Sequence, residues 1–340
     1  MVRSLDILDF LHKADDRPIV DVRSPGEFSR GHIPGACSLP LFSNEERERV
    51  GICYKNEGHD AAVMLGLEIV GPKMRPLGER LIELADGAMP LLHCWRGGMR
   101  SQSVGWLAEQ VGLEPEVLTG GYKSYRRLAH ADFERHRPII VLSGMTGAGK
   151  TTMLKALQAA GEQVVDLEAL ANHRGSSFGG LGLPDQPTCE QFENELFEQL
   201  RRVDRDRPVW LEDESPSIGK VRVPDTLWSM MRRSPAIVLD VSREQRSRNL
   251  VEEYGALDRD GLQEATSRLE RRLGGQRVKE LLSYLDDDDL YKFAFELLAY
   301  YDKTYLHAAT KKKPRKEVYK LSGEITVDRL IAFSREKCAA

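Results

Sequence analysis

The sequence predicts an α/β fold of two consecutive units, each built round a parallel sheet, followed by a largely helical region. Short apolar runs bounded by turn residues recur as far as Val241, and segments with helical apolar spacing separate them. Two of these runs end directly at a glycine-rich loop, one at Cys94 and the other at Gly144. From Arg243 to at least Tyr300 the pattern is helical.

Length and composition indicate an ordinary globular protein. A chain of 340 residues with 41% hydrophobic residues can bury the cores of two domains. Five cysteines without a framework spacing favour a reducing, cytoplasmic compartment. We expect no membrane segment, because no apolar run is long enough and the first residues lack a signal-peptide core. The net charge of -4 leaves a nucleic-acid partner open, since such binding needs only a local basic face.

The first unit should carry a strand at Ala36–Leu39 and strands at three further apolar runs. Pro18–Arg23 and Ala88–His93 predict short buried strands, and Glu116–Leu118 predicts another. Between the last two, Ser101–Gln110 has the spacing of a helix that begins just after Cys94. This alternation favours a parallel sheet.

The second unit begins after a polar, charged stretch at residues 129–137. Pro138–Ser143 predicts an apolar strand and Thr151–Ala160 predicts the helix after it. Three more runs predict strands: Glu162–Leu167, Pro208–Asp213 and Ala236–Val241. The predicted domains are therefore residues 1–130, 137–242 and 243–340.

The loop Gly144-Met145-Thr146-Gly147-Ala148-Gly149-Lys150-Thr151 matches the complete Walker A pattern between a strand and a helix. Its glycines let backbone N–H groups turn inward, and the following helix adds its dipole, so the loop suits a polyphosphate. Lys150 should reach the terminal phosphates and Thr151 could ligate Mg²⁺. The predicted phosphate-binding residues are Gly144, Thr146, Gly147, Ala148, Gly149, Lys150, Thr151 and Thr152. The pattern leaves open whether phosphate is hydrolysed, transferred or only held, and the diphosphate need not belong to ATP.

Acidic residues end one of the predicted strands of this unit. Glu212 and Asp213 are candidates for a second element that holds Mg²⁺. The alternative is a strand that ends in acids without a metal.

The loop after Ala88–His93 has the composition of a reactive cysteine site. Nearby cations and a helix N-terminus both favour a thiolate, and Cys94 is predicted to have both. The predicted anion-binding residues beside Cys94 are Trp95, Arg96, Gly97, Gly98, Met99 and Arg100. The alternative, a buried structural cysteine, does not explain the two glycines and two arginines that follow at once.

Two strings near the start resemble the signature of rhodanese domains, which are small sulfurtransferase modules. They are Asp21-Val22-Arg23-Ser24-Pro25-Gly26-Glu27-Phe28 and Gly31-His32-Ile33-Pro34-Gly35-Ala36. The resemblance covers roughly residues 5–130. The loop here has five residues between Cys94 and Arg100, whereas a rhodanese loop usually has four. This longer spacing is also the signature of cysteine phosphatases, some of which share the rhodanese fold.

A rhodanese-like domain joined to a Walker A domain resembles one family closely, the tRNA 2-selenouridine synthases. The matching strings are His93 to Ser101, Gly144 to Thr152 and Ala171-Asn172-His173-Arg174-Gly175-Ser176-Ser177-Phe178-Gly179. The resemblance implies a rhodanese-like parallel-sheet domain, a P-loop NTPase-like α/β domain and a helical C-terminal extension. It also implies a transferase that replaces sulfur by selenium at wobble 2-thiouridine of tRNA, with selenophosphate and geranyl diphosphate as co-substrates.

Under this resemblance Cys94 would handle selenium, Arg96 and Arg100 would neutralise selenophosphate, and Lys150 would neutralise the departing diphosphate. The implied substrate loop is His173, Arg174, Gly175 and Ser176. The candidate tRNA contacts are Arg271, Arg272, Lys311, Lys312, Lys313 and Arg315. An enzyme that supplies selenophosphate is an expected partner.

Two other functions remain compatible with the motifs. A rhodanese-fold cysteine phosphatase fused to a nucleotide-binding domain explains the loop length and the Walker A pattern. A non-enzymatic carrier of persulfide or selenium, switched by its Walker A domain, is the second. Release of phosphate from an aryl phosphate would favour the first, and stoichiometric selenium binding without turnover would favour the second.

Overall fold

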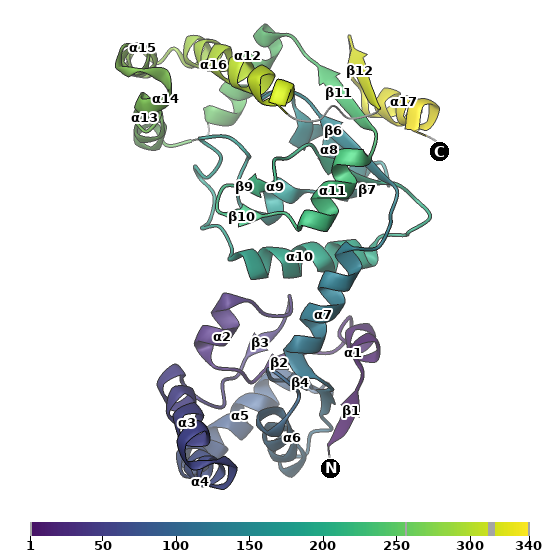
Figure 1. Ribbon diagram of the computed structural model, residues 1–340, viewed down its shortest axis with the longest axis vertical. Coiled ribbons are helices and arrows are strands. Elements are labelled where there is room, and N and C mark those ends of the chain that lie inside the picture. The colour runs from purple at the N-terminus through teal and green to yellow at the C-terminus, as the bar shows by residue number, and fades with distance from the viewer. Residues whose placement is uncertain (1, 256, 312–316, 339–340) are drawn as a thin grey trace. The chain divides into compact units, whose positions relative to one another are not determined.

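The computed structural model describes residues 2–255, 257–311 and 317–338. The chain forms two compact units, Met1–Asp132 and Phe133–Ala340. Each unit contains its own parallel five-stranded sheet (Figure 1). The predicted α/β fold class is confirmed.

In the N-terminal unit the strands follow the order β1-β5-β4-β2-β3, and all neighbours are parallel. The strands are β1 (Arg3–Leu5), β2 (Ile19–Asp21), β3 (Cys37–Ser38), β4 (Leu91–His93) and β5 (Glu116–Leu118). The α-helices are α1 (Ile7–Lys13), α2 (Pro25–Arg30), α3 (Asn44–Glu57), α4 (His59–Val70), α5 (Met74–Ala85), α6 (Met99–Gln110) and α7 (Gly121–Phe133). The central strand β4 is buried along its whole length because helices cover both faces of a parallel sheet.

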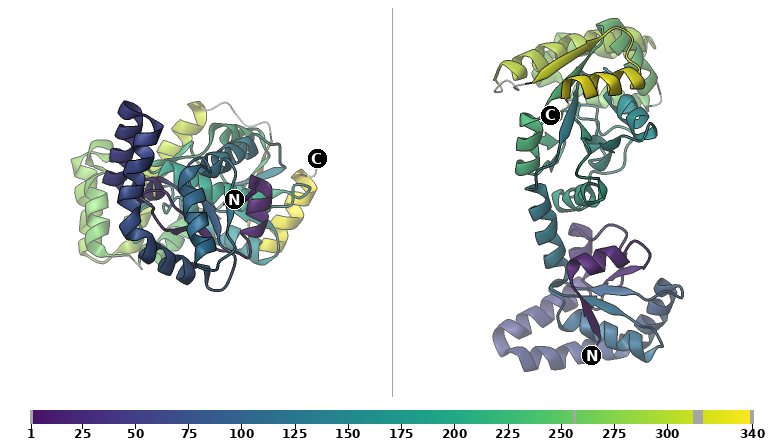
Figure 2. Two further views of the ribbon diagram at one scale, coloured as in Figure 1. Left: turned by 90° about the horizontal axis from the view of Figure 1, so that it is seen from below. Right: turned by 90° about the vertical axis from the view of Figure 1, so that its right-hand side faces the viewer.

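Helices α3 and α4 form a hairpin that the sequence analysis did not predict as such. Ser43 caps α3 through a capping box with Glu46. The chain then reverses at Gly58, whose φ of 94° is the left-handed region that glycine tolerates. The two helices pack against each other and project from the sheet of their unit in the right-hand view of Figure 2.

In the C-terminal unit the strands follow the order β12-β11-β6-β8-β7, again all parallel. The strands of this unit, including a separate antiparallel pair β9/β10, are β6 (Ile139–Ser143), β7 (Gln163–Val165), β8 (Val209–Glu212), β9 (Ser217–Ile218), β10 (Val221–Arg222), β11 (Ala236–Asp240) and β12 (Val318–Ser322). The helices that alternate with the strands are α8 (Lys150–Ala159), α9 (Leu167–Leu170), α10 (Cys189–Arg202) and α11 (Asp225–Arg233).

The region predicted as a helical extension, residues 243–340, is mostly helical but also completes the sheet. Its helices are α12 (Arg243–Tyr254), α13 (Arg259–Ser267), α14 (Glu270–Leu273), α15 (Gly275–Asp286), α16 (Leu290–Lys311) and α17 (Val327–Cys338). Strand β12 pairs with β11 over five residues, and α17 packs on α8, so this part of the region belongs to the P-loop sheet. The prediction missed β12 because Lys320 and Ser322 interrupt its apolar residues, and only Leu321 is buried, as in an edge strand.

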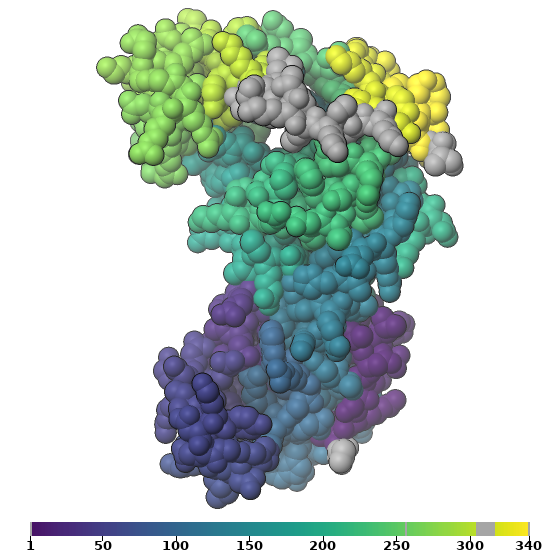
Figure 3. Space-filling view, in the orientation of Figure 1, coloured from purple at the N-terminus to yellow at the C-terminus, as the bar shows by residue number. Residues whose placement is uncertain are grey.

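Helices α12 to α16 share a core of their own. Phe178, Leu250, Leu281, Phe293 and Leu297 are among its buried members. The atoms of α13 to α15 form the light-green mass of Figure 3. Among the described residues, no helix combines the length and the apolar character that a membrane crossing requires.

Candidate functional site

Cys94 follows β4, the middle strand of the N-terminal sheet, and only 3% of it is exposed. Its Sγ lies 3.3 Å from the hydroxyl oxygen of Ser101. That hydroxyl donates a hydrogen bond to the carbonyl of Gly98 at 3.1 Å. Since α6 begins at Met99, the sulfur lies beside the first turn of a helix, where the dipole favours negative charge.

Two glycines let the Cys94 loop pack against the turn that follows β5. A Cβ atom on Gly121 would lie 2.3 Å from the carbonyl oxygen of Cys94 and 2.4 Å from the nitrogen of Gly97. Gly121 and Gly97 both have positive φ, 58° and 65°. The N–H of Tyr122 donates to the carbonyl of Cys94 at 2.8 Å. The loop is thus closed by backbone contacts that leave no room for side chains.

The two arginines of the loop have different surroundings. Arg100 donates to the Glu27 carboxylate, with an Nη1–Oε2 distance of 2.7 Å, and Arg47 contacts the same oxygen at 2.9 Å. Although burial opposes it, the hydrogen bond and charge of Arg100 hold the pKa of Glu27 below its usual value. Arg96 and Trp95 are exposed. Arg96 therefore presents its charge to solvent, while Arg100 is already paired.

Buried polar side chains lie next to the strand that leads into the Cys94 loop. Arg23 donates to both carboxylate oxygens of Asp21, with Nε–Oδ1 at 3.0 Å and Nη2–Oδ2 at 2.6 Å, and it donates to the carbonyl of Gly31 at 2.7 Å. Its guanidinium lies 3.8 Å from the ring centre of Tyr122. His93 Nε2 is 3.7 Å from Asp21 Oδ2, and burial lowers the pKa of His93 although Asp21 opposes this. Sequence analysis noted Asp21, Arg23 and His93 only as parts of family signatures and predicted strands, and it did not identify Tyr122.

The second predicted loop, residues 144–149, joins β6 to α8 in the C-terminal unit. It follows the middle strand of its sheet, at the carboxyl edge where α/β folds bind ligands. Gly149 precedes α8 with φ 80° and ψ 24°, a left-handed conformation suited to glycine. Lys150 Nζ donates to the carbonyl of Gly144 at 3.3 Å, so the lysine side chain folds back over the loop.

Two side chains of helix α12 donate hydrogen bonds to this phosphate loop. Arg246 donates to the carbonyl of Thr146 at 3.2 Å, and Asn249 donates to the carbonyl of Gly147 at 2.8 Å. A Cβ atom on Gly147 would lie 2.8 Å from the carbonyl oxygen of Arg246. Because these contacts use carbonyl groups, they leave the N–H groups of the loop for an anion. Sequence analysis did not identify either side chain.

Carboxylates gather beside the phosphate loop. Glu212, at the end of β8, is fully buried and accepts the backbone N–H of Glu168 at 2.5 Å. Thr151 donates to Glu168 at 3.4 Å. Burial and the charge of Glu214 raise the pKa of Glu168 to about 8, although Lys150 opposes the shift. Burial likewise raises the pKa of Glu212 and of Glu214. This cluster therefore carries more potential negative charge than one lysine neutralises.

The second acidic residue of the predicted pair, Asp213, accepts a hydrogen bond from Ser143 at 2.8 Å. Within the described part of the chain, no three His, Cys, Asp or Glu side chains are grouped so that they could hold a metal ion. An ion that binds together with a diphosphate needs few protein ligands, because phosphate oxygens and water complete its shell.

The predicted substrate loop lies against the acidic cluster. The backbone N–H of His173 donates to the carbonyl of Glu168 at 3.0 Å. A Cβ atom on Gly175 would lie 2.6 Å from Glu168 Oε1, so only glycine allows this approach. Arg174 contacts Glu253 of α12 at 3.2 Å, and the N–H of Ser176 donates to the carbonyl of Arg174 at 2.7 Å. The structure therefore places the predicted substrate loop against Glu168 of the acidic cluster and Glu253 of α12.

The candidate tRNA contacts are only partly described. Arg271 and Arg272 are exposed on α14. Lys311 ends α16, and its side chain lies outside the described part. Lys312, Lys313 and Arg315 lie outside the described residues altogether.

Comparison with known proteins agrees with this arrangement of loops. A model of the rhodanese-like domain matches residues 6–128. The model described as the tRNA 2-selenouridine synthase AAA domain matches residues 137–328, more than half of the 340 residues. The chain belongs to the tRNA 2-selenouridine synthase family. This confirms the resemblance inferred from the motifs.

Individual members of the family align along most of the chain. The tRNA 2-selenouridine synthase of Aeromonas salmonicida is 37% identical over 339 residues, covering 88% of this chain and 90% of that protein. The Sulfurovum synthase is 36% identical over 328 residues, 86% of this chain and 88% of its own. The Nitrosomonas europaea synthase is 39% identical over 247 residues, 70% of this chain but only 64% of that protein, less than two thirds of its length.

Proposed function

We propose that this protein is a tRNA-modifying transferase that replaces the sulfur of wobble 2-thiouridine by selenium. Selenophosphate donates the selenium, and geranyl diphosphate first alkylates the sulfur to make it a better leaving group. The observation that carries the proposal is the match of residues 137–328 to the synthase AAA domain. Two anion-binding loops, at Cys94 and at Lys150, support a division of the reaction into two steps.

The first step uses the phosphate loop. The sulfur of 2-thiouridine attacks C1 of the geranyl chain, the S–C bond forms as the C–O bond breaks, and diphosphate leaves. The base loses its N3 proton. Lys150 and the N–H groups at the start of α8 neutralise the charge that develops on the leaving oxygen.

Residues of the acidic cluster fit a magnesium ion that binds with the diphosphate. Thr151 and the carboxylate of Glu168 lie together beside Lys150, and the cluster has an excess of carboxylates. Mg²⁺ would neutralise both the carboxylates and the diphosphate when bound. A partly protonated Glu168 would release its proton as the cation binds, because a nearby positive charge lowers a carboxyl pKa.

The second step uses the cysteine loop. The thiolate of Cys94 attacks C2 of the alkylated base, and the C–S bond to the geranyl group's sulfur breaks, so that geranylthiol leaves with a proton. The selenium of selenophosphate then displaces Cys94. Water cleaves the P–Se bond, phosphate leaves and the base regains its N3 proton. Selenium keeps its oxidation state throughout, so the step needs no oxidant.

The charged groups of the cysteine loop suit this second donor. Arg96 is exposed and can pair with the phosphate of selenophosphate, and the first turn of α6 offers its dipole. An enzyme that makes selenophosphate is the expected supplier. Arg271 and Arg272 are the described candidates for contacts with tRNA phosphates.

Mass spectrometry of the wobble nucleoside tests both steps. Transfer RNA carrying 2-thiouridine is incubated with the protein and geranyl diphosphate, and then with selenophosphate. We expect the geranylated base first and the selenium base second. If neither donor changes the nucleoside, the proposed function is wrong.

Two variants separate the steps. Cys94→Ala should retain geranylation and lose selenium incorporation. Lys150→Ala should lose geranylation but still convert tRNA that is geranylated beforehand. Cys189→Ala and Lys155→Ala, both exposed and each matched to one variant, are the controls. Equal loss of both steps in both variants would contradict this division of labour.

A further inference from the structure

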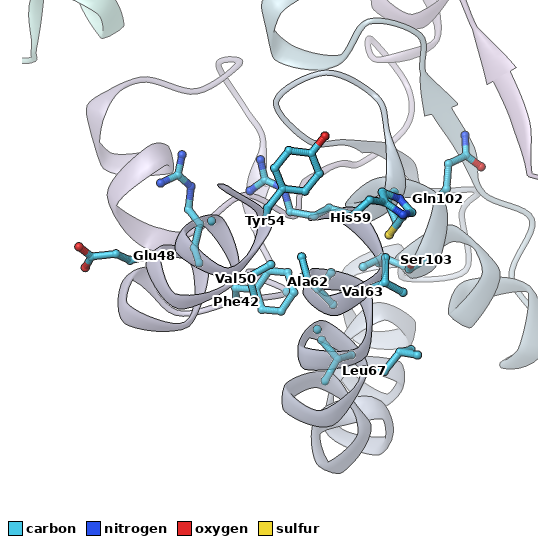
Figure 4. A pocket seen from close by; sticks show the side chains of 18 of the residues that line it. Phe42, Glu48, Val50, Tyr54, His59, Ala62, Val63, Leu67, Gln102 and Ser103 are labelled. Atoms are coloured by element: carbon cyan, nitrogen blue, oxygen red, sulfur yellow. The ribbon is translucent and has the colours of Figure 1, made fainter. Parts of the chain in front are cut away.

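An apolar pocket of about 990 Å³ opens between α3, α4 and α6 of the N-terminal unit. Its walls include core side chains, since Phe42, Val104 and Leu107 are 8%, 1% and 7% exposed. Figure 4 shows Phe42, Val50 and Ala62 next to one another in this pocket, with Leu67 further along α4. The volume is in the range of pockets that bind small molecules.

The pocket also exposes large apolar side chains, which soluble proteins rarely gather without a ligand or partner. Trp106 and Leu67 are 51% and 62% exposed. Other exposed hydrophobic residues of its lining are Ile52, Tyr54 and Met99. Because α3 and α4 supply much of this surface, the hairpin gives the pocket its apolar wall.

The pocket borders the cysteine loop. Met99 and Arg100, the first residues of α6, line it, as do Gln102 and Ser103 one turn further on. Ser101 lies between them and contacts the sulfur of Cys94 at 3.3 Å. One helical turn therefore separates the reactive sulfur from an apolar cavity.

Two arginines line the part of the pocket next to the first turn of α6. Arg100 and Arg47 both line the pocket and both bind Glu27, with distances of 2.7 and 2.9 Å. The pocket thus fits a molecule with an apolar chain and a polar head, with the head near the start of α6. A flat surface for a second protein would not need a cavity that reaches the core.

We propose that this pocket binds the geranyl chain of the S-geranyl-2-thiouridine intermediate. The bound chain then presents the C2 atom of the base to Cys94. The inference rests on the proposed function and assigns a substrate subsite to its second step. Each buried CH₂ group strengthens binding about fourfold. The alkylated nucleoside is therefore selected over 2-thiouridine, and the cysteine loop receives only a base that has a good leaving group.

A binding measurement tests the pocket without any turnover. The full-length protein is titrated calorimetrically with the S-geranyl-2-thiouridine nucleoside and with S-methyl-2-thiouridine, which lacks the long chain. Wild type should bind the geranyl compound more tightly by tenfold or more, since about ten apolar carbons are buried. Equal affinity for the two nucleosides would overturn the proposal.

Neighbouring residues on α4 provide matched variants. Val63 lines this pocket, whereas Met64 does not and is 67% exposed. Val63→Glu should weaken geranyl-nucleoside binding about tenfold or more, because it places a charge in an apolar cavity. Met64→Glu should bind like wild type. Gly66→Leu fills the pocket with an apolar side chain and favours the helix; its Cβ would lie 3.6 Å from Phe42, an ordinary contact.

Kinetics on tRNA that is geranylated beforehand give the second readout. KM for selenium incorporation should rise about tenfold in Val63→Glu and in Gly66→Leu, with Met64→Glu unchanged.

Unchanged binding and KM in both pocket variants would refute the subsite, even if wild type carries out both steps. Loss of geranyl binding in these variants, with no turnover by wild type on any tRNA, would keep the subsite and refute the proposed function. A change of oligomeric mass in Val63→Glu without any loss of nucleoside binding would assign the pocket to a second copy of the chain instead.

Discussion

Arg246 of α12 forms a two-point ion pair with Asp302 of α16, with Nη1–Oδ1 and Nη2–Oδ2 distances of 2.9 and 2.8 Å. The same Nη1 donates to the carbonyl of Thr146 in the phosphate loop at 3.2 Å. Arg246 is only 4% exposed. The ion pair thus fixes the arginine that holds the loop, and it links the C-terminal helices to the phosphate site.

Arg246→Lys should raise KM for geranyl diphosphate, the proposed donor, about tenfold, because lysine cannot bind Asp302 at two points and reach Thr146 as well. Arg243→Lys is the matched control, since Arg243 contacts Asp302 at 3.5 Å and is 39% exposed. Calorimetric binding of inorganic diphosphate checks the effect. Normal diphosphate binding by a destabilised Arg246→Lys protein would reduce Arg246 to a purely structural role.

Gly121→Ala should disrupt the cysteine loop. The added Cβ would lie 2.3 Å from the carbonyl oxygen of Cys94, and a left-handed conformation costs an L-residue roughly 1–2 kcal/mol even without a clash. Gly112→Ala is the control, because its φ of 85° is also positive but no atom lies within 4 Å of the added Cβ. Thermal unfolding and selenium incorporation are measured. Similar losses in both variants would show that backbone strain alone, without the contact to Cys94, explains the effect.

Stability should fall as pH rises through the pKa of Glu168. Burial and Glu214 raise that pKa to about 8 from its ordinary value of 4.5, so the folded state binds the proton more tightly than the unfolded state. The stabilisation is complete below about pH 4.5 and is lost as pH rises to about 8. Glu168→Gln should flatten this dependence, whereas the exposed Glu252→Gln should not. Thermal unfolding between pH 4.5 and 9 measures it, and an unchanged slope in Glu168→Gln would contradict the assignment.

Replacing Arg271 and Arg272 together by alanine should weaken tRNA binding and its salt dependence. Each lost phosphate contact lowers the slope of log K against log salt by about 0.7–0.9. Arg75 and Arg80 form ion pairs on the exposed surface of α5, and their double alanine variant is the control. Filter binding over a range of salt concentrations gives both slopes. Equal slopes for wild type and Arg271→Ala/Arg272→Ala would remove α14 from the proposed tRNA interface.

The strand, loop and helix of each predicted site could be recognised from sequence because their requirements are local. Gly149 must be left-handed before α8, and Lys150 follows it at once, so the chemistry and the backbone share one string of residues. The same holds for Cys94, which lies between a buried strand and the start of α6. Family membership, confirmed by comparison, depends on these strings.

Only the tertiary structure showed what surrounds those strings. Arg246 and Thr146 are 100 residues apart, and Arg100 and Glu27 are 73 apart, so no local pattern predicts that they meet. Glu168 looks like an ordinary helix residue until the fold buries it beside Glu212 and Glu214. The apolar pocket likewise depends on how α3, α4 and α6 pack. Local backbone preferences act over a few residues, whereas partners, burial and pKa shifts depend on which distant segments the sheet brings together.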